Sequence, residues 1–183
     1  MVIDTQLSKL MNIDSSILKE RLSTKYKVSE NTFRKAEKKV DTIPKDIKDS
    51  LRNGEGIFPG LLGEFLVEHV KKGELKNTRD YDLITPAGLK IDAKTKVRSV
   101  APLSHYFCSV TDFNTRQKCD DYAFVSLLSD YSYGWFLGSI EKKEFYKKAK
   151  FFKKGEKDPT SPPHKPFYFK CDCYNLEIYK LTH

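Results

Sequence analysis

The sequence predicts an α/β fold, in which a mixed β-sheet core is flanked by helices, with a helical extension at the N-terminus. Three observations lead to this prediction: a regular helical apolar pattern at 57–72, a series of short strand-like segments after it, and a helical segment among the later strands. Helices placed among strands in this way cover the faces of one sheet. We therefore divide the chain into a helical extension, 1–54, and a sheet domain, 55–183.

The N-terminal extension is charged, poor in aromatic residues, and carries signals for helix starts. Asp14 precedes the apolar pair at 17–18. Ser29 precedes Phe33, and Pro44 opens a further segment. These signals predict three or four short helices. The apolar residues among them are too few for an independent core, so we expect the extension to pack on the remainder of the chain or on a partner.

The sheet domain begins with the most regular helix of the chain. Its apolar residues follow a helical period from 57 to 72, and Gly73 ends it. The segments after it predict a hairpin turning at 85–89, strands at 105–110, 122–128 and 134–140, a helix at 142–152, and a final pair of strands at 167–171 and 176–181. The lysines and prolines of 147–165 predict a long exposed connection before that last pair.

The chain carries an excess of positive charge. Its 183 residues include 33 Lys and Arg against 25 Asp and Glu, which gives a net charge of +8 and an isoelectric point near 9.2. Such a balance suits a polyanion, because neutralising phosphates releases counterions, although solvated surface lysines give the same excess. The charge therefore favours a nucleic acid as partner, against which the N-terminal helices could also pack.

Neither a membrane span nor a disulfide framework is predicted. No apolar run approaches the roughly 20 residues that a membrane-spanning helix requires. The four cysteines lack the paired C-x-x-C spacing of a structural zinc site, and no secretory signal precedes them. We expect free thiols in a cytoplasmic protein.

Charged residues occupy the predicted hairpin at 79–96, RDYDLITPAGLKIDAKTK, where a sheet normally places apolar side chains. Alternate side chains of a strand share a face. Asp92 therefore points the same way as Lys94, and Asp80 points the same way as Asp82. This pattern predicts that acidic and basic groups gather on one side of the hairpin.

A pairing of Ile84 with Ile91 across the turn would bring Asp82 near Asp92 or Lys94, so that two carboxylates and an ammonium converge. Buried carboxylates repel unless a cation joins them, and hard oxygen ligands suit Mg²⁺ or Mn²⁺. This arrangement suits phosphodiester hydrolysis. The metal polarises the scissile phosphate and lowers the pKa of a bound water, while Lys94 orients that water and stabilises the developing charge.

These residues and the preceding helix resemble the motifs of the PD-(D/E)XK nuclease superfamily. In that superfamily a helix carries Glu, a hairpin carries Asp, and the next strand carries (D/E)-x-K. The corresponding stretches here are GLLGEFLVE at 60–68, YDL at 81–83 and IDAKT at 91–95, and the similarity spans roughly 55–181. The hairpin aspartate follows Tyr81, where the superfamily motif has proline.

The resemblance implies a restriction-endonuclease-like fold and a metal-dependent DNA endonuclease. It implies Asp82 and Asp92 as metal ligands, with the carbonyl of Ala93 as a third. It implies Lys94 as the catalytic lysine and Glu64 as an auxiliary or second-metal ligand. Mg²⁺ is the expected cofactor, with Mn²⁺ as the alternative. One such site attacks one strand at a time, so a homo-oligomer, a dimer or higher, is the simplest route to a double-strand break.

Further polar side chains are predicted to contact DNA: Lys96, Arg98, Gln117, Lys118, Lys153 and Lys154. For Lys153 and Lys154, an exposed loop with solvated charges is an equally good interpretation. For Gln117 and Lys118, a position on a helix surface is the favoured interpretation.

Three alternatives stay open. Asp80 shares the face of Asp82 and is an alternative ligand, although Asp82 fits the motif better. A second alternative is a non-catalytic or DNA-repair/recombination nucleic-acid-binding protein with the same fold, and the intact Asp82, Asp92 and Lys94 set disfavours the non-catalytic form. A helix-turn-helix regulator is disfavoured because 1–54 lacks a helix-turn-glycine-helix core. Within the nuclease class we favour a restriction or homing enzyme.

Overall fold

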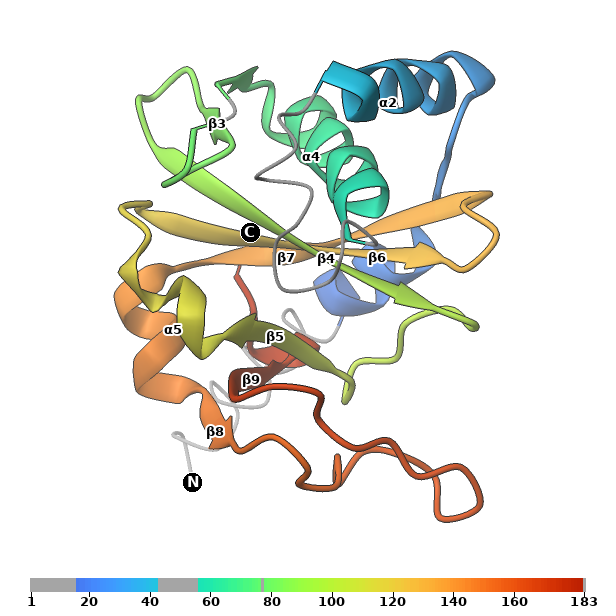
Figure 1. Cartoon of the computed structure of the whole chain (residues 1–183), viewed down its shortest axis with the longest axis vertical. Helices are drawn as coiled ribbons and strands as arrows, with labels where there is room; N and C mark the ends of the chain where they lie inside the picture. Colours follow the sequence, from blue (N-terminus) through green and yellow to red (C-terminus); the bar gives the residue numbers. More distant parts are fainter. Residues whose placement is uncertain (1–15, 43–55, 77, 183) are drawn as a thin grey trace, which may run out of the picture.

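The computed structural model describes residues 16–42, 56–76 and 78–182, and these form a mixed α/β fold (Figure 1). The main sheet has the strand order β1-β7-β6-β4-β3-β2 and is built from β1 (Tyr26–Lys27), β2 (Glu74–Leu75), β3 (Leu83–Ile84), β4 (Lys90–Arg98), β6 (Asp121–Leu128) and β7 (Tyr133–Glu141). β4 and β6 are parallel, and the other neighbours are antiparallel. The prediction of an α/β fold with a mixed sheet and flanking helices is confirmed.

A second, antiparallel sheet has the order β5-β9-β8 and is built from β5 (Phe107–Thr111), β8 (Lys150–Phe152) and β9 (Cys173–Glu177). The helical elements are a helix at 16–23, α2 (Glu30–Thr42), α4 (Ile57–Lys71), α5 (Lys142–Lys148), and the short 3₁₀ turns η1 (Asp112–Arg116) and η2 (Ile178–Lys180). No helix in the described ranges is long and apolar enough to cross a membrane. All four cysteines are free.

The elements cover the main sheet on both faces. α4 crosses one face with α2 packed outside it, and α5 and the second sheet lie on the opposite face (Figure 1). β6 is therefore buried on both sides, and its alternate residues enter two cores. Val125 packs with α4, whereas Tyr122 and Phe124 pack with α5 and β9. This double coverage explains why 122–128 reads as a continuous apolar run.

The described part of the N-terminal extension packs on the sheet domain. β1 pairs with β7 at the edge of the main sheet, and Ala36 of α2 is fully buried in the core that α4 makes with the sheet. The Ser29 hydroxyl caps α2, because its Oγ accepts the Thr32 N–H at 3.1 Å. The helix predicted after Pro44 lies outside the described residues.

The predicted helix at 57–72 is α4, and the predicted strands at 105–110, 122–128 and 134–140 are β5, β6 and β7 within two residues. The C-terminal predictions are correct only in part, because a helix begins at Lys142 as expected but is shorter. The helix expected at 142–152 ends at Lys148, because the next residues are extended and pair with β9 as β8.

The strand expected at 167–171 belongs instead to an arm, residues 153–170, that folds back on itself. The Gly155 N–H donates to the Phe169 carbonyl, and the Asp158 N–H donates to the Phe167 carbonyl, both at 2.8 Å. The last strand is β9, which ends at Glu177, and η2 occupies half of the segment expected as a strand at 176–181.

The predicted hairpin is present with a register different from the expected one. Its turn closes with a hydrogen bond of 2.9 Å from the Thr85 N–H to the Leu89 carbonyl. Leu83 stands opposite Ile91, and Ile84 stands opposite Lys90, so the expected pairing of Ile84 with Ile91 is wrong by one position. This register buries both Leu83 and Ile91 against α4, which explains the preference for it.

α4 lies close to β4 at Gly63. A Cβ atom at Gly63 would lie 1.8 Å from the Thr95 hydroxyl oxygen. Only glycine permits this approach, which holds the following residue, Glu64, beside the strand that carries Asp92 and Lys94.

We predict that Gly63→Ala lowers the free energy of unfolding by about 1–3 kcal/mol, because the added methyl overlaps the Thr95 side chain. Equilibrium urea denaturation measures the effect. Adding Thr95→Ala to Gly63→Ala should restore part of the loss, because it removes the clashing hydroxyl.

Gly60→Ala is the matched control in the same helix. A Cβ atom at Gly60 would meet no atom within 4 Å, and alanine in place of a helical glycine stabilises by up to about 1 kcal/mol. Stabilisation by both Gly60→Ala and Gly63→Ala would contradict the close packing of α4 on β4.

Candidate functional site

The candidate site lies where β4 continues beyond its short partner β3. The Asp82 N–H donates to the Ile91 carbonyl at 2.9 Å and extends the hairpin ladder by one bond. The Ala93 N–H then donates to Asp82 Oδ2 at 2.7 Å, so a carboxylate replaces the next main-chain acceptor. Because N–H and C=O of one strand residue point the same way, the Ala93 carbonyl faces the edge that carries Asp82.

Asp92, Lys94 and Gln117 form a closed set of contacts. Asp92 is only 2% exposed, and its Oδ2 lies 2.5 Å from Lys94 Nζ in an ion pair. Gln117 Nε2 donates to Asp92 Oδ1 at 3.1 Å, and Lys94 Nζ donates to Gln117 Oε1 at 3.0 Å. The amide therefore bridges the carboxylate and the ammonium, and it fixes both.

Gln117, predicted from the sequence to contact DNA or to lie on a helix surface, instead bridges Asp92 and Lys94. It follows η1, and its N–H donates to the Asn114 carbonyl at 3.2 Å. Its own carbonyl accepts a hydrogen bond from Lys142 Nζ. The contacts of its side chain reach residues more than twenty positions away, so no local sequence pattern could reveal them.

Glu64 reaches the same region from α4. Its Oε2 atom is buried without a hydrogen-bond partner. Burial raises the pKa of the Glu64 carboxyl, Lys39 acts to lower it, and the negative charge of Asp92 raises it further. Glu64, Asp82 and Asp92 therefore interact electrostatically, and we call these three residues the carboxylate cluster.

The carboxylate cluster is electrostatically strained. Burial raises the pKa of Asp82 well above its ordinary value, and the charges of Asp92 and Glu64 raise it further. The hydrogen bond from Ala93 and the charge of Lys94 act in the opposite direction. The charge of one ammonium thus acts on three carboxylates, an arrangement whose repulsion an additional cation would relieve.

The residues present fit a Mg²⁺ ion. In the described part of the chain, no three His, Cys, Asp or Glu side chains have the spacing of a preformed metal cage. Mg²⁺ does not need one, because one or two carboxylates hold it together with waters and substrate phosphates. Asp82, Asp92 and the Ala93 carbonyl supply hard oxygen donors at one edge, and the unpartnered Glu64 Oε2 is a further candidate donor.

Asp80, the alternative to Asp82, is directed elsewhere. Its Oδ1 accepts the Lys118 N–H at 3.3 Å, which ties the loop before β3 to the segment that carries Gln117. The contact of Asp82 with Ala93 instead lies on β4 itself. The geometry favours Asp82 as the ligand.

The other residues predicted to contact DNA differ in how exposed their side chains are. Lys96 and Arg98 continue the row of Lys94 along β4 and are partly buried. Lys118 is exposed beside Gln117. Lys153 and Lys154 are exposed at the start of the arm, and in the described residues no contact joins either one to the carboxylate cluster.

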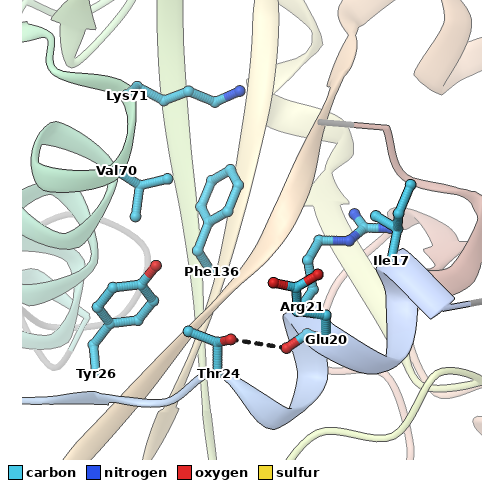
Figure 2. Close-up of a pocket in the computed structure, with 8 residues that line it drawn as sticks. All are labelled: Ile17, Glu20, Arg21, Thr24, Tyr26, Val70, Lys71 and Phe136. Atoms are coloured by element: carbon cyan, nitrogen blue, oxygen red, sulfur yellow. Dashed lines mark hydrogen bonds between the residues drawn. The ribbon is translucent and has the colours of Figure 1, made fainter.

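A separate pocket of about 430 Å³ lies between the helix at 16–23, the end of α4, and β7 (Figure 2). It is lined by Ile17, Glu20, Arg21, Thr24, Tyr26, Val70, Lys71 and Phe136. The Arg21 guanidinium donates to the Leu137 carbonyl at 2.9 Å, and Lys71 Nζ donates to Ser139 Oγ at 3.0 Å. Both cations are thus hydrogen-bonded to the protein, and we assign this pocket no part in the candidate site.

No protein-family model matches the chain, and the comparison with curated proteins finds no match. The functional interpretation therefore depends on the motif residues and on their geometry.

We predict that Asp82→Asn raises the melting temperature at pH 7 in EDTA. The folded state raises the pKa of Asp82 above its ordinary value of 3.8, so the ionised carboxyl destabilises the folded state once the pH exceeds that value. Asparagine removes the charge and keeps an oxygen that can accept the Ala93 N–H. Thermal unfolding followed by circular dichroism measures the gain, which should vanish in acid.

Asp80→Asn is the control for this measurement, because Asp80 is partly exposed and its carboxylate accepts a hydrogen bond from the Lys118 N–H, which an asparagine oxygen can also accept. It should change the melting temperature little. A lower melting temperature for Asp82→Asn than for wild type at pH 7 would show that the carboxylate stabilises the fold.

Proposed function

We propose that the protein is a metal-dependent DNA endonuclease with a restriction-endonuclease-like fold, of the restriction or homing type. The observation that carries the proposal is the meeting of Asp82, Asp92 and Lys94 at the edge where β4 leaves β3, with Glu64 on the adjoining helix. The order of these residues along the chain resembles the PD-(D/E)XK motif. A strained acidic cluster beside a lysine is also the arrangement that metal-assisted phosphodiester hydrolysis needs.

Each residue has a role that follows from its contacts. Asp82, Asp92 and the Ala93 carbonyl would hold Mg²⁺ or Mn²⁺, which supplies polarisation of the scissile phosphate and a water of lowered pKa. Lys94 would donate hydrogen bonds to the attacking water and to the charge that develops on the phosphate. Gln117 keeps the ammonium of Lys94 beside Asp92 through its amide oxygen.

DNA is the proposed substrate, and the net charge of +8 supports a polyanion. Lys118 lies exposed next to Gln117, where it can meet a phosphate near the reacting one. A homo-oligomer is proposed as well, because one site of this geometry attacks one strand at a time and two copies would cut both.

The proposal is tested by incubating the purified protein with supercoiled plasmid and with linear DNA, in Mg²⁺, in Mn²⁺ or in EDTA. Nicked or linear products should form only with the divalent cation, because the proposed mechanism activates the attacking water only through the cation. Full cleavage in excess EDTA, or none under any of these conditions, would contradict the proposal.

Lys94→Ala should slow the chemical step at least about a hundredfold, since the lysine stabilises transition-state charge worth on the order of 3 kcal/mol. Binding should change little, because most of the proposed phosphate contacts involve other residues. Single-turnover cleavage at saturating protein measures the rate, and a titration in Ca²⁺ measures binding without chemistry.

Lys153→Ala is the matched control, because this lysine is exposed on the arm. It should weaken binding modestly, reduce the salt dependence of binding and leave the single-turnover rate intact. Wild-type cleavage by Lys94→Ala would show that Lys94 is an ordinary charge on the hairpin.

Gln117→Ala should lower the single-turnover rate roughly tenfold or more, because it removes a hydrogen bond to a charged group worth about 1.5–3 kcal/mol. Binding in Ca²⁺ should be retained, which separates a positioning role from a DNA contact. Arg116→Ala is the neighbouring exposed control and should keep the wild-type rate. Loss of binding in Gln117→Ala with an unchanged rate at saturation would assign Gln117 to DNA contact instead.

A further inference from the structure

β4 carries a row of cations that continues beyond Lys94. Lys96 and Arg98 occupy alternate positions after Lys94 and therefore lie on the same face of the strand, the face toward the second sheet. Lys96 Nζ lies 5.7 Å from the centre of the Phe167 ring, and the Arg98 guanidinium lies 4.9 Å from that of Tyr106. The row thus runs from the carboxylate cluster to a place beneath the arm.

Lys96 and Arg98 form a partly buried pair of like charges. Neither makes an ion pair in the described residues, and Arg98 Nε is buried without a hydrogen-bond partner. Burial, together with the charge of Arg98, lowers the pKa of Lys96 to about 8. Among the described residues, the Arg98 guanidinium donates one hydrogen bond, to the Phe107 carbonyl at 2.8 Å.

The acidic residue that acts on both cations is Asp158 of the arm. Its Oδ1 accepts hydrogen bonds from the Thr160 N–H at 2.8 Å and from Thr160 Oγ1 at 2.7 Å, and it forms no ion pair with either cation in the described residues. Within the described part of the chain, the two cations therefore keep hydrogen-bond donors without a protein acceptor, Arg98 Nε among them. Two adjacent cations with free donors are costly to bury unless an anion joins them.

We propose that Lys96 and Arg98 form a phosphate-binding subsite, which takes a phosphate group of the nucleic-acid strand that reacts beside Lys94. This inference rests on the proposed nuclease function. An ammonium and a guanidinium side by side match the several oxygens of a phosphate, and the planar guanidinium favours two parallel hydrogen bonds.

The spacing of the row supports a phosphate of the same strand. Alternate residues of a strand are about 6.6 Å apart, which is close to the separation of consecutive phosphates along a nucleic-acid strand. A strand that follows β4 with its scissile phosphate at Lys94 would therefore bring a neighbouring phosphate to Lys96 and Arg98. That phosphate is either an internal diester or the terminal phosphate of a strand that ends beneath the arm.

The test is a set of binding titrations in Ca²⁺ with short duplexes that differ in one phosphate. In each duplex one phosphate near the cleavage position is replaced by a neutral methylphosphonate, and a further pair differs only in a 5′-phosphate or a 5′-hydroxyl. Neutralising the phosphate that the subsite holds should weaken wild-type binding about tenfold. For Lys96→Met, neutralising that same phosphate should not weaken binding, whereas neutralising the other phosphates should weaken it as much as in wild type.

Arg98→Gln is the second variant. Its affinity should not fall when the phosphate that has no effect on Lys96→Met is neutralised. It keeps the test decisive if Lys96→Met does not fold, and Lys153→Ala should show the wild-type pattern. If the variants lose their response to neutralisation of an internal phosphate, the subsite holds a diester. If they lose only their response to the 5′-phosphate, the subsite holds a terminal phosphate. A wild-type response of both variants to every modified phosphate would overturn the subsite.

A parallel titration with inorganic pyrophosphate, followed by NMR, separates this inference from the proposed function. Wild type should bind pyrophosphate at least about tenfold more tightly than Lys96→Met or Arg98→Gln. If the protein cleaves DNA but Lys96→Met and Arg98→Gln respond to every modified phosphate as wild type does, the subsite is refuted and the proposed nuclease function stands. Pyrophosphate binding that requires both residues, in a protein that cleaves no DNA, would support the subsite and refute the nuclease.

Discussion

The candidate site depends on the short length of β3. Because β3 begins only at Leu83 while its antiparallel partner β4 continues to Arg98, the carboxylate of Asp82 takes the place of a main-chain acceptor and receives the Ala93 N–H at 2.7 Å. This hydrogen bond fixes Asp82 beside the strand that carries Asp92. The close approach of α4 at Gly63 adds Glu64 to the same region, so the fold gathers three carboxylates whose charges oppose one another.

The fold thus gives up stability at the carboxylate cluster. Direct charge contact within the site comes from Lys94, which pairs with Asp92 and is held there by Gln117. The pKa values of Asp82 and Glu64 are raised, as expected when desolvated carboxylates repel one another. Such strain at a site that the core positions rigidly is a common mark of function, and a divalent cation would relieve it.

Local patterns predicted the elements that matter most for this site. The apolar period of α4, the turn at 85–89 and the alternation along 91–98 depend on neighbouring residues, and they placed Glu64 and the charged face of β4 on the correct elements. The register of the hairpin was wrong by one, because the burial of Leu83 against α4 decides it. Gln117 and the arm over Lys96 depend on distant contacts, which no short pattern contains.

The most direct test of the account is the response of thermal stability to a divalent cation. If the carboxylate cluster is the cation site, the melting temperature of wild type should rise as Mg²⁺ or Mn²⁺ is added, with a gain of about 2.7 kcal/mol at a hundredfold excess over the dissociation constant. Asp92→Asn should remove most of that rise. An equal rise in wild type and Asp92→Asn, or no rise in wild type, would contradict the account.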